Sequence, residues 1–179
     1  MMFLFVLFVV AFFMLYLQAY FKVPSELQII QTSLEQLHPD MLLEKQPIYV
    51  YDEIYNPADV IATTFKYQYL NKTLSLSNRD YLKKNLSRFL LIYNDSDNIV
   101  EVDISSPHRN HEITFYSGLF VNKFYKVAKS SNTENFTKVK LKPSNMFVLP
   151  LNWMYKTKEN NILEIHLFDM ISKGYSFVA

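Results

Sequence analysis

The first 21 residues constrain this chain more than any other stretch, because they carry no charged side chain. They read MMFLFVLFVVAFFMLYLQAYF, and Lys22 is the first charged residue. A helix rises about 1.5 Å per residue, so this run spans roughly 30 Å, the thickness of the hydrocarbon core of a bilayer. Tyr16 and Tyr20 lie near its carboxyl end, where aromatic side chains favour the lipid headgroups. We therefore predict a membrane-spanning helix over residues 1–21 and an anchor over residues 1–22.

A cleaved signal peptide is the main alternative for this segment. Signal peptides begin with basic residues, have a shorter apolar core and end in an A-x-A-like cleavage site. Here no basic side chain precedes the apolar run, the run is longer, and Leu17-Gln18-Ala19 fits the cleavage pattern poorly. A buried helix of a soluble core is a third interpretation, although the run has no polar face. These features favour an anchor that is retained.

Composition excludes several classes of chemistry in the rest of the chain. About 155 residues follow the anchor, enough for one domain with a hydrophobic core. The absence of cysteine excludes disulfides, thiolate nucleophiles, Cys-ligated zinc and iron–sulfur clusters. The two glycines, Gly118 and Gly174, are too few for a phosphate-binding loop or a dinucleotide fingerprint. The net charge of +1 and the scattered lysines give no reason to expect a nucleic-acid partner.

Residues 23–40 are predicted to form an amphipathic helix that connects the anchor to the domain. Ser25 is a suitable N-cap, and His38-Pro39 would end the helix because the residue before proline avoids the helical region. The apolar stripe consists of Leu27, Ile30, Leu34 and Leu37. We expect this stripe to pack on the domain, and the alternative is that it pairs with a protein partner near the membrane.

Residues 41–179 are predicted to form a single domain that is mainly β, with a helical amino-terminal part. A short helical turn over 41–46 leads to a strand over 47–51, and Asn56-Pro57 opens a second helix. The runs that follow form three predicted strand pairs: 88–93 with 99–104, 124–127 with 136–141, and 145–150 with 162–168. Many short strands separated by polar turns indicate a β-sandwich, jelly roll or barrel. The fold class is therefore α+β.

The run from Lys140 to Tyr155 resembles the second conserved segment of cupin and JmjC-like domains. The matching residues are a turn at Pro143-Ser144-Asn145, an apolar strand over 146–149, and then Pro150, Asn152, Trp153 and Tyr155. The stretch over 43–50 is similar to the entry of JmjC-like domains. The whole chain also resembles short, membrane-anchored cupin-like proteins of large DNA viruses. This resemblance implies a cupin-like jelly-roll domain over 41–179.

The departures from the family pattern bear on catalysis. A non-haem iron oxygenase needs two histidines and one carboxylate. Tyr155 stands where the family has its second histidine, and no H-x-D or H-x-E pair is found. The resemblance therefore implies a degenerate copy that is not an enzyme and holds no cofactor.

Two other clusters are candidates for metal binding or proton transfer. His108, His111 and Glu112 form H-x-x-H-E, which matches neither zinc-protease order and follows a proline. Glu164 and His166 share one face of a predicted strand and could form a carboxylate–imidazole pair. The simpler interpretation is a solvated loop for the first cluster and the solvent face of a strand for the second. No Ser/His/Asp arrangement is legible.

Four N-x-S/T sequons, at Asn71, Asn85, Asn94 and Asn135, would be glycosylated only in a secretory lumen. Lys22 follows the span, and positive residues favour the cytoplasmic side, so we expect the domain in the cytoplasm or inside a virion.

The sequence predicts a single-pass membrane protein with a structural or interaction role, and the resemblance implies that it is associated with a virion or a membrane. A membrane-bound metal-dependent oxygenase with atypical ligands and a barrel that binds a small ligand are the alternatives.

Overall fold

A computed structural model of the chain describes residues 2–65, 71–76, 81–106, 108–109, 113, 115–116, 124–128, 135–157 and 162–178. Its helical elements are α1 (Met2–Phe21), the 3₁₀ helix η1 (Pro39–Glu44), α2 (Pro57–Thr64) and α3 (Met170–Val178). The strands in the first half of the chain are β1 (Ile30–Thr32), β2 (Ile48–Val50), β3 (Asn71–Leu76), β4 (Lys83–Asn85) and β5 (Phe89–Asn94). The later strands are β6 (Val100–Ser105), β7 (Phe115–Tyr116), β8 (Tyr125–Ala128), β9 (Thr137–Leu141), β10 (Met146–Pro150), β11 (Met154–Thr157) and β12 (Ile162–Phe168).

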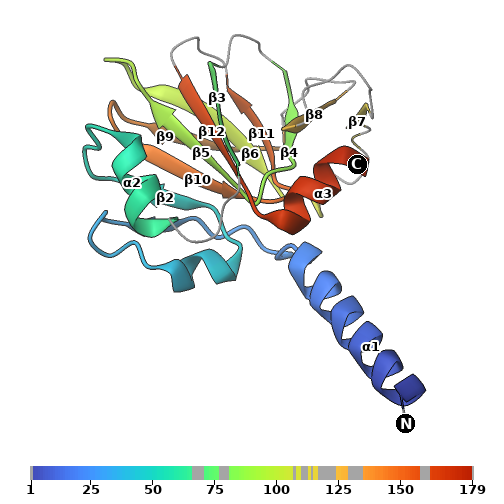
Figure 1. Cartoon of the computed structure of the whole chain (residues 1–179). Helices are drawn as coiled ribbons and strands as arrows, with labels where there is room; N and C mark the ends of the chain where they lie inside the picture. The colour runs from blue at the N-terminus through green and yellow to red at the C-terminus, as the bar shows by residue number, and fades with distance from the viewer. Residues whose placement is uncertain are drawn as a thin grey trace.

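Helix α1 projects from the base of the β-rich part as a straight rod (Figure 1). Its side chains from Phe3 to Tyr16 are almost all exposed, including Phe3 at 75% and Phe13 at 53%. Within the described residues it is the one helix long and apolar enough to cross a membrane. Exposed apolar area of this size is what a surrounding bilayer would cover, and it distinguishes α1 from the core helix of a soluble protein.

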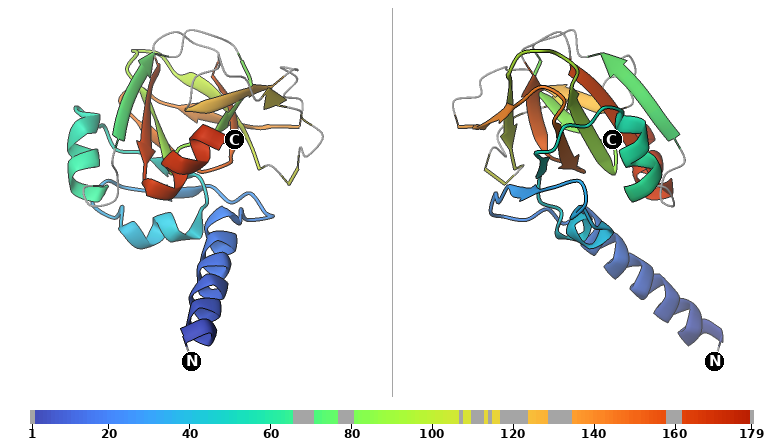
Figure 2. Two further views of the ribbon diagram at one scale, coloured as in Figure 1. Left: turned by 45° about the vertical axis from the view of Figure 1, so that its right-hand side comes forward. Right: turned by 90° about the vertical axis from the view of Figure 1, so that its left-hand side faces the viewer.

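The strands form two sheets that pack face to face (Figure 2). Sheet A has the order β1-β2-β10-β5-β12-β3, and sheet B has the order β7-β8-β4-β11-β6-β9. All pairings between the described strands are antiparallel except that of β1 with β2. The described residues therefore confirm a mainly β architecture of class α+β with an amino-terminal helix.

Two hydrophobic cores lie on the two faces of sheet A. The core between the sheets contains Leu90, Ile92, Phe147 and Leu149 of sheet A with residues of β6, β9 and β11. The outer core packs alternate residues of the same strands, such as Leu91 and Val148, against α2 and η1. Central strand β5 is accordingly buried at every position, so its sequence shows no apolar–polar alternation.

The three predicted strand pairs are wrong, although the strands themselves form. β5 belongs to sheet A and β6 to sheet B, so the polar run after β5 crosses between sheets instead of closing a hairpin. The Asn94 side chain shapes this crossing: its amide donates to the carbonyls of Asn98 and Leu141, and its oxygen accepts from the Ser96 amide. β8 and β9 are not paired, and β10 and β12 lie on opposite sides of β5.

The predicted amphipathic helix over 23–40 is also wrong, because this segment is extended and contributes β1. Side chains from later in the chain form hydrogen bonds with the backbone of this segment. The Gln46 side chain accepts from the Gln28 amide and donates to the Glu26 carbonyl, and the Asp52 carboxylate accepts from the Leu34 amide at 2.6 Å. The apolar residues still reach the cores, Leu27 between the sheets and Leu34 outside sheet A. Long-range pairing has overridden a local helical pattern.

Candidate functional site

The core between the sheets contains a set of buried polar side chains, which we call the interior polar cluster. Its members are Lys83, Ser87, Tyr155, Glu164 and His166. Lys83 on β4 and Tyr155 on β11 belong to sheet B, whereas Glu164 and His166 on β12 belong to sheet A. All are at most 3% exposed. The prediction that Glu164 and His166 face solvent is therefore wrong, because β12 is covered on both faces.

Glu164 is the centre of this cluster. Lys83 Nζ lies 2.7 Å from Glu164 Oε1, and the Tyr155 hydroxyl donates to Glu164 Oε2 at 3.1 Å. The Lys83 ammonium also lies over the Tyr125 ring, 4.8 Å from its centroid. A buried charge pair is tolerated only where further hydrogen bonds and dipoles satisfy both partners, and this geometry meets that requirement.

The protonation states follow from burial and from these contacts. Burial would raise the pKa of Glu164, but the contact with His166 and the Lys83 charge outweigh it and lower the pKa to about 2. Burial lowers the pKa of His166, against the opposing effect of Glu164. Burial and the neighbouring Glu164 carboxylate raise the pKa of Tyr155 well above its ordinary value. At neutral pH the cluster thus holds an ionised Glu164, with Tyr155 protonated as a donor to it.

We expect acid to destabilise the fold through this cluster. The pKa of Glu164 is lowered from 4.5 to about 2, so its stabilising contribution is present above pH 4.5 and is lost as the pH falls through 2. This shift corresponds to about 3 kcal/mol. The lowered pKa of His166 acts in the same direction below pH 6.5. The free energy of unfolding, measured against pH, should therefore fall in acid, and Glu164→Gln should remove the part of the slope that Glu164 contributes between pH 4.5 and 2 while the part from His166 stays. Equal slopes in the two proteins would contradict this assignment.

The cluster also contains a serine–histidine–carboxylate chain that the sequence analysis missed. Ser87 Oγ lies 3.3 Å from His166 Nδ1, and His166 Nε2 lies 3.7 Å from Glu164 Oε2. The order matches that of a nucleophile, base and acid. However, Ser87 is fully buried and its hydroxyl contacts Asn85 Oδ1 at 2.5 Å. Because that amide oxygen can only accept, the hydroxyl proton is committed to it, and the buried hydroxyl is not accessible to a substrate.

A metal ion of the kind that the cupin resemblance would imply does not fit this cluster. The facial iron site requires two histidines and a carboxylate, whereas the cluster offers one of each. Lys83 already neutralises Glu164 at 2.7 Å, so an incoming cation would meet an ammonium group. Within the described part of the chain, no three His, Asp or Glu side chains converge to hold a metal.

The other predicted candidates do not join the cluster. His108 is exposed at its loop, where its Nε2 contacts the Val23 carbonyl oxygen at 3.0 Å. His111 and Glu112 lie outside the described residues. The sequons divide by exposure: Asn85 and Asn94 are fully buried, Asn135 is exposed, and the side chain of Asn71 lies outside the description. Asn85 and Asn94 are thus inaccessible to glycosylation in the folded chain.

The residues that resemble the cupin segment have structural roles here. The turn at Pro143-Ser144-Asn145 leads into β10, and the Asn145 amide donates to the carbonyls of Tyr51 and Asp52, both at 2.9 Å. Pro150 ends β10, and its carbonyl accepts from the side-chain amide of Asn85 at 3.0 Å. Asn152 has a left-handed backbone with φ 70° and accepts from the Tyr175 hydroxyl at 3.4 Å.

The end of α1 enters the domain at a second polar site, which we call the membrane junction. The Tyr20 hydroxyl lies 2.6 and 2.7 Å from the two carboxylate oxygens of Asp169 and shares its one proton between them. The Arg88 guanidinium lies 4.3 Å from the Tyr20 ring centroid and 3.9 Å from Asp169 Oδ2. Asp169 also accepts from the Ser172 amide at 2.8 Å, so it caps α3 as well. Tyr20 is only 6% exposed.

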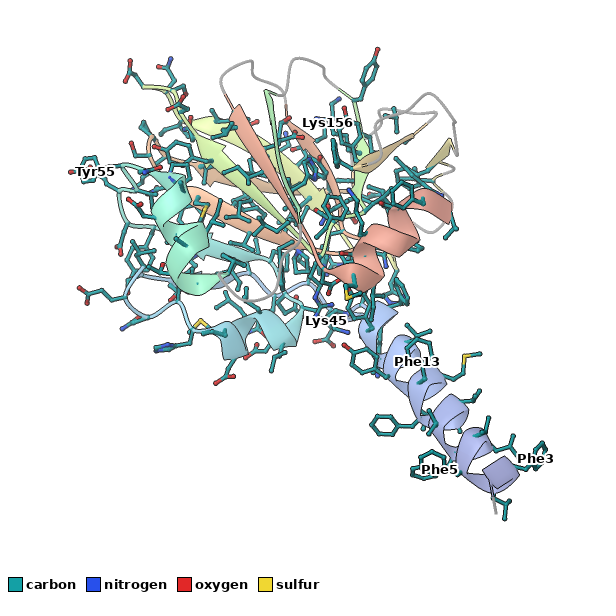
Figure 3. The ribbon with its side chains drawn as sticks, in the orientation of Figure 1. Phe3, Phe5, Phe13, Lys45, Tyr55 and Lys156 are labelled. Carbon is teal, nitrogen blue, oxygen red and sulfur yellow. The ribbon has the colours of Figure 1, made fainter. Side chains whose placement is uncertain are left out.

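Lys45 completes the junction from the other side. Its ammonium donates to the last carbonyls of α1, those of Ala19 and Tyr20, and to the Lys22 carbonyl at 3.1 Å. A cation at this place satisfies carbonyls that lack partners in the helix and opposes the helix dipole. In Figure 3, Lys45 lies beside the end of α1 that enters the domain. The carbonyl of Lys45 in turn accepts from Trp153 Nε1 at 3.1 Å.

Apolar contacts seal the same junction. The Phe21 and Tyr175 rings have centroids 4.9 Å apart, which joins α1 to α3. Val23 is buried in the core between the sheets. The residues at the end of α1 are therefore part of the folded domain.

Comparison with models of known protein families finds no match, and comparison with curated proteins finds no similar sequence. The function must therefore be argued from the two sites described above.

Proposed function

We propose that this chain is a single-pass membrane protein that retains α1 as its anchor and holds its domain in a fixed orientation at the membrane surface. The membrane junction carries this proposal. Tyr20 and Phe21 lie at the end of the apolar helix, yet Tyr20 is buried against Asp169 and Arg88 of the domain. A leader that is cut away would not supply buried side chains to the mature fold. A flexible tether would not need Lys45 to cap its last carbonyls.

A structural or interaction role accounts for the interior polar cluster better than catalysis does. Its charges are neutralised within the core, and its serine hydroxyl is committed to Asn85. A catalyst needs a cavity where polar groups converge on a substrate. We infer that the cluster fixes how the two sheets pair, since an unmatched charge would penalise any other arrangement.

We further propose that the two sheets are a degenerate cupin-like jelly roll. The support is that Tyr155, which stands in the place of the family's histidine, points into the core and donates to Glu164. A cytoplasmic or virion-interior domain and a protein partner near the membrane remain predictions from the sequence and its resemblance.

The anchor is tested on the full chain expressed in cells. We expect the protein to stay in the membrane pellet after alkaline carbonate extraction, because about 20 apolar residues insert stably. Its intact mass should include residues 1–21. Phe8→Ala serves as a control that removes an exposed ring from the span and leaves the junction unchanged. A soluble product that lacks α1 would contradict the proposal.

A further inference from the structure

A cavity of about 350 Å³ lies where α1 meets the domain, and the proposed function leaves it unexplained. It is lined by Phe21, Lys22, Val23, Ser25, Lys84, His108 and Asn152. Phe21 is the last residue of α1, so the cavity begins at the level where the apolar helix ends. Its size is within the range of small-molecule sites in proteins.

Positive charge dominates this cavity. Lys22 and Lys84 line it, and no carboxylate is among its described lining residues. Lys126 lies directly across from Lys84 on the neighbouring strand β8, and like charges in such pairs repel. Burial is the main cause that lowers the pKa of the Lys84 ammonium, and the charge of Lys126 lowers this pKa further. An anion in the cavity would relieve this repulsion and compensate for the desolvation of Lys84.

Neutral polar groups and apolar surface complete the lining. Ser25 and Asn152 offer a hydroxyl and an amide that can donate to phosphate oxygens. Phe21, the last residue of α1, and Val23 supply apolar surface to the lining. This combination suits a molecule with an anionic head and an apolar tail.

We propose that this cavity binds the phosphate group of an anionic membrane lipid, with Lys22 and Lys84 as its charged ligands. The inference rests on the proposed function, because only an α1 that spans the bilayer brings the cavity to the headgroup layer. Free inorganic phosphate shares the anionic chemistry but lacks the apolar part.

The test measures binding to the full chain in a neutral detergent. The probes are a short-chain phosphatidic acid, the phosphatidylcholine of the same chain length, and inorganic phosphate. We expect phosphatidic acid to bind most tightly. Each of Lys22→Gln and Lys84→Gln should weaken it by about fivefold, the effect typical of one lysine at an anionic membrane surface. The double variant Lys140→Gln/Lys142→Gln removes two exposed lysines elsewhere and should bind like the wild type.

Three outcomes would overturn the inference. The first is that phosphatidic acid and phosphatidylcholine bind equally tightly. The second is that inorganic phosphate binds as tightly as phosphatidic acid. The third is that the control variant loses as much affinity for phosphatidic acid as the cavity variants do. A thermal melt of each variant establishes that it is folded. The binding is read in detergent, so it does not depend on anchoring in cells. A mature protein without α1 would contradict the proposed function. A protein that keeps α1 but whose binding of phosphatidic acid does not depend on Lys22 and Lys84 would contradict this inference alone.

Discussion

Lys83→Met and Glu164→Gln should each destabilise the fold strongly, while the double variant should be far less affected than their sum. Removing one partner of a buried ion pair leaves an uncompensated charge and costs about 3–5 kcal/mol. Lys83 and Glu164 are 3% and 0% exposed, with 2.7 Å between Nζ and Oε1, so neither charge can turn to water. Methionine fills most of the volume of the lysine stem, and glutamine keeps an acceptor for the Tyr155 hydroxyl.

The four proteins form a double-mutant cycle on the free energy of unfolding, measured with denaturant on the full chain in detergent. We expect a coupling of about 2–3 kcal/mol, the upper part of the range for contacting residues. Lys142→Met removes an exposed lysine and should change the stability by less than about 0.5 kcal/mol. Additive effects of the two substitutions would show that the charges do not depend on each other, and would remove the support for a cluster that fixes sheet pairing.

Tyr20→Ala should destabilise the domain even though Tyr20 belongs to the apolar helix. Deleting a buried aromatic side chain costs about 3–5 kcal/mol. Here the change also removes the hydrogen bond that the hydroxyl shares between the two Asp169 oxygens, and the ring beneath Arg88. Tyr20→Phe keeps the ring and should cost about 1.5–3 kcal/mol, the range for a hydrogen bond to a charged group.

The matched control is Phe8→Ala, because Phe8 lies on the same helix about three turns before Tyr20 and is 70% exposed. It should leave the unfolding of the domain unchanged within about 0.5 kcal/mol. Domain unfolding is followed by circular dichroism in detergent. If the two alanine variants were equally stable, Tyr20 would not be part of the folded domain.

Local signals in the sequence predicted much of the local structure. Asn56 caps α2 by accepting from the Ala58 amide at 3.0 Å, and Pro57 is at its first turn. The strand over 47–51 and the strand after Pro143 also form, as β2 and β10. These features depend on neighbouring residues only, so short-range patterns were sufficient.

The partners of the strands could not be predicted, because pairing in this fold is long-range. β5 is hydrogen bonded to β10 and β12, both more than 50 residues further along the chain. Polar turns therefore predicted hairpins between strands that do not pair, as after β5, where the chain crosses to the other sheet. Helix α3 was missed, although Asp169 and Ser172 provide a capping pair that marks its start.

The candidate site was predicted only in part for a related reason. The spacing of Glu164 and His166 correctly placed both on one face of β12, but spacing cannot reveal that sheet B covers that face. Nothing in the sequence marked Lys83 or Ser87 as part of a site. Lys83 stands next to Lys84, and two adjacent lysines usually indicate a strand exposed to solvent. At the junction, the sequence predicted that Tyr20 lies at the lipid headgroups. Its hydrogen bond to Asp169 could not be predicted, because it depends on how the chain folds.

The central claim is that α1 and the domain form one rigid body, and a distance measurement between spin labels tests it directly. The chain has no cysteine, so Phe13→Cys and Tyr55→Cys place one label on the exposed surface of α1 and one on the domain. In lipid nanodiscs the account predicts a single narrow distance distribution, which Tyr20→Ala broadens and Phe8→Ala does not. A broad distribution in the labelled protein with Tyr20 intact would contradict the account, because it would mean that α1 is a flexible tether.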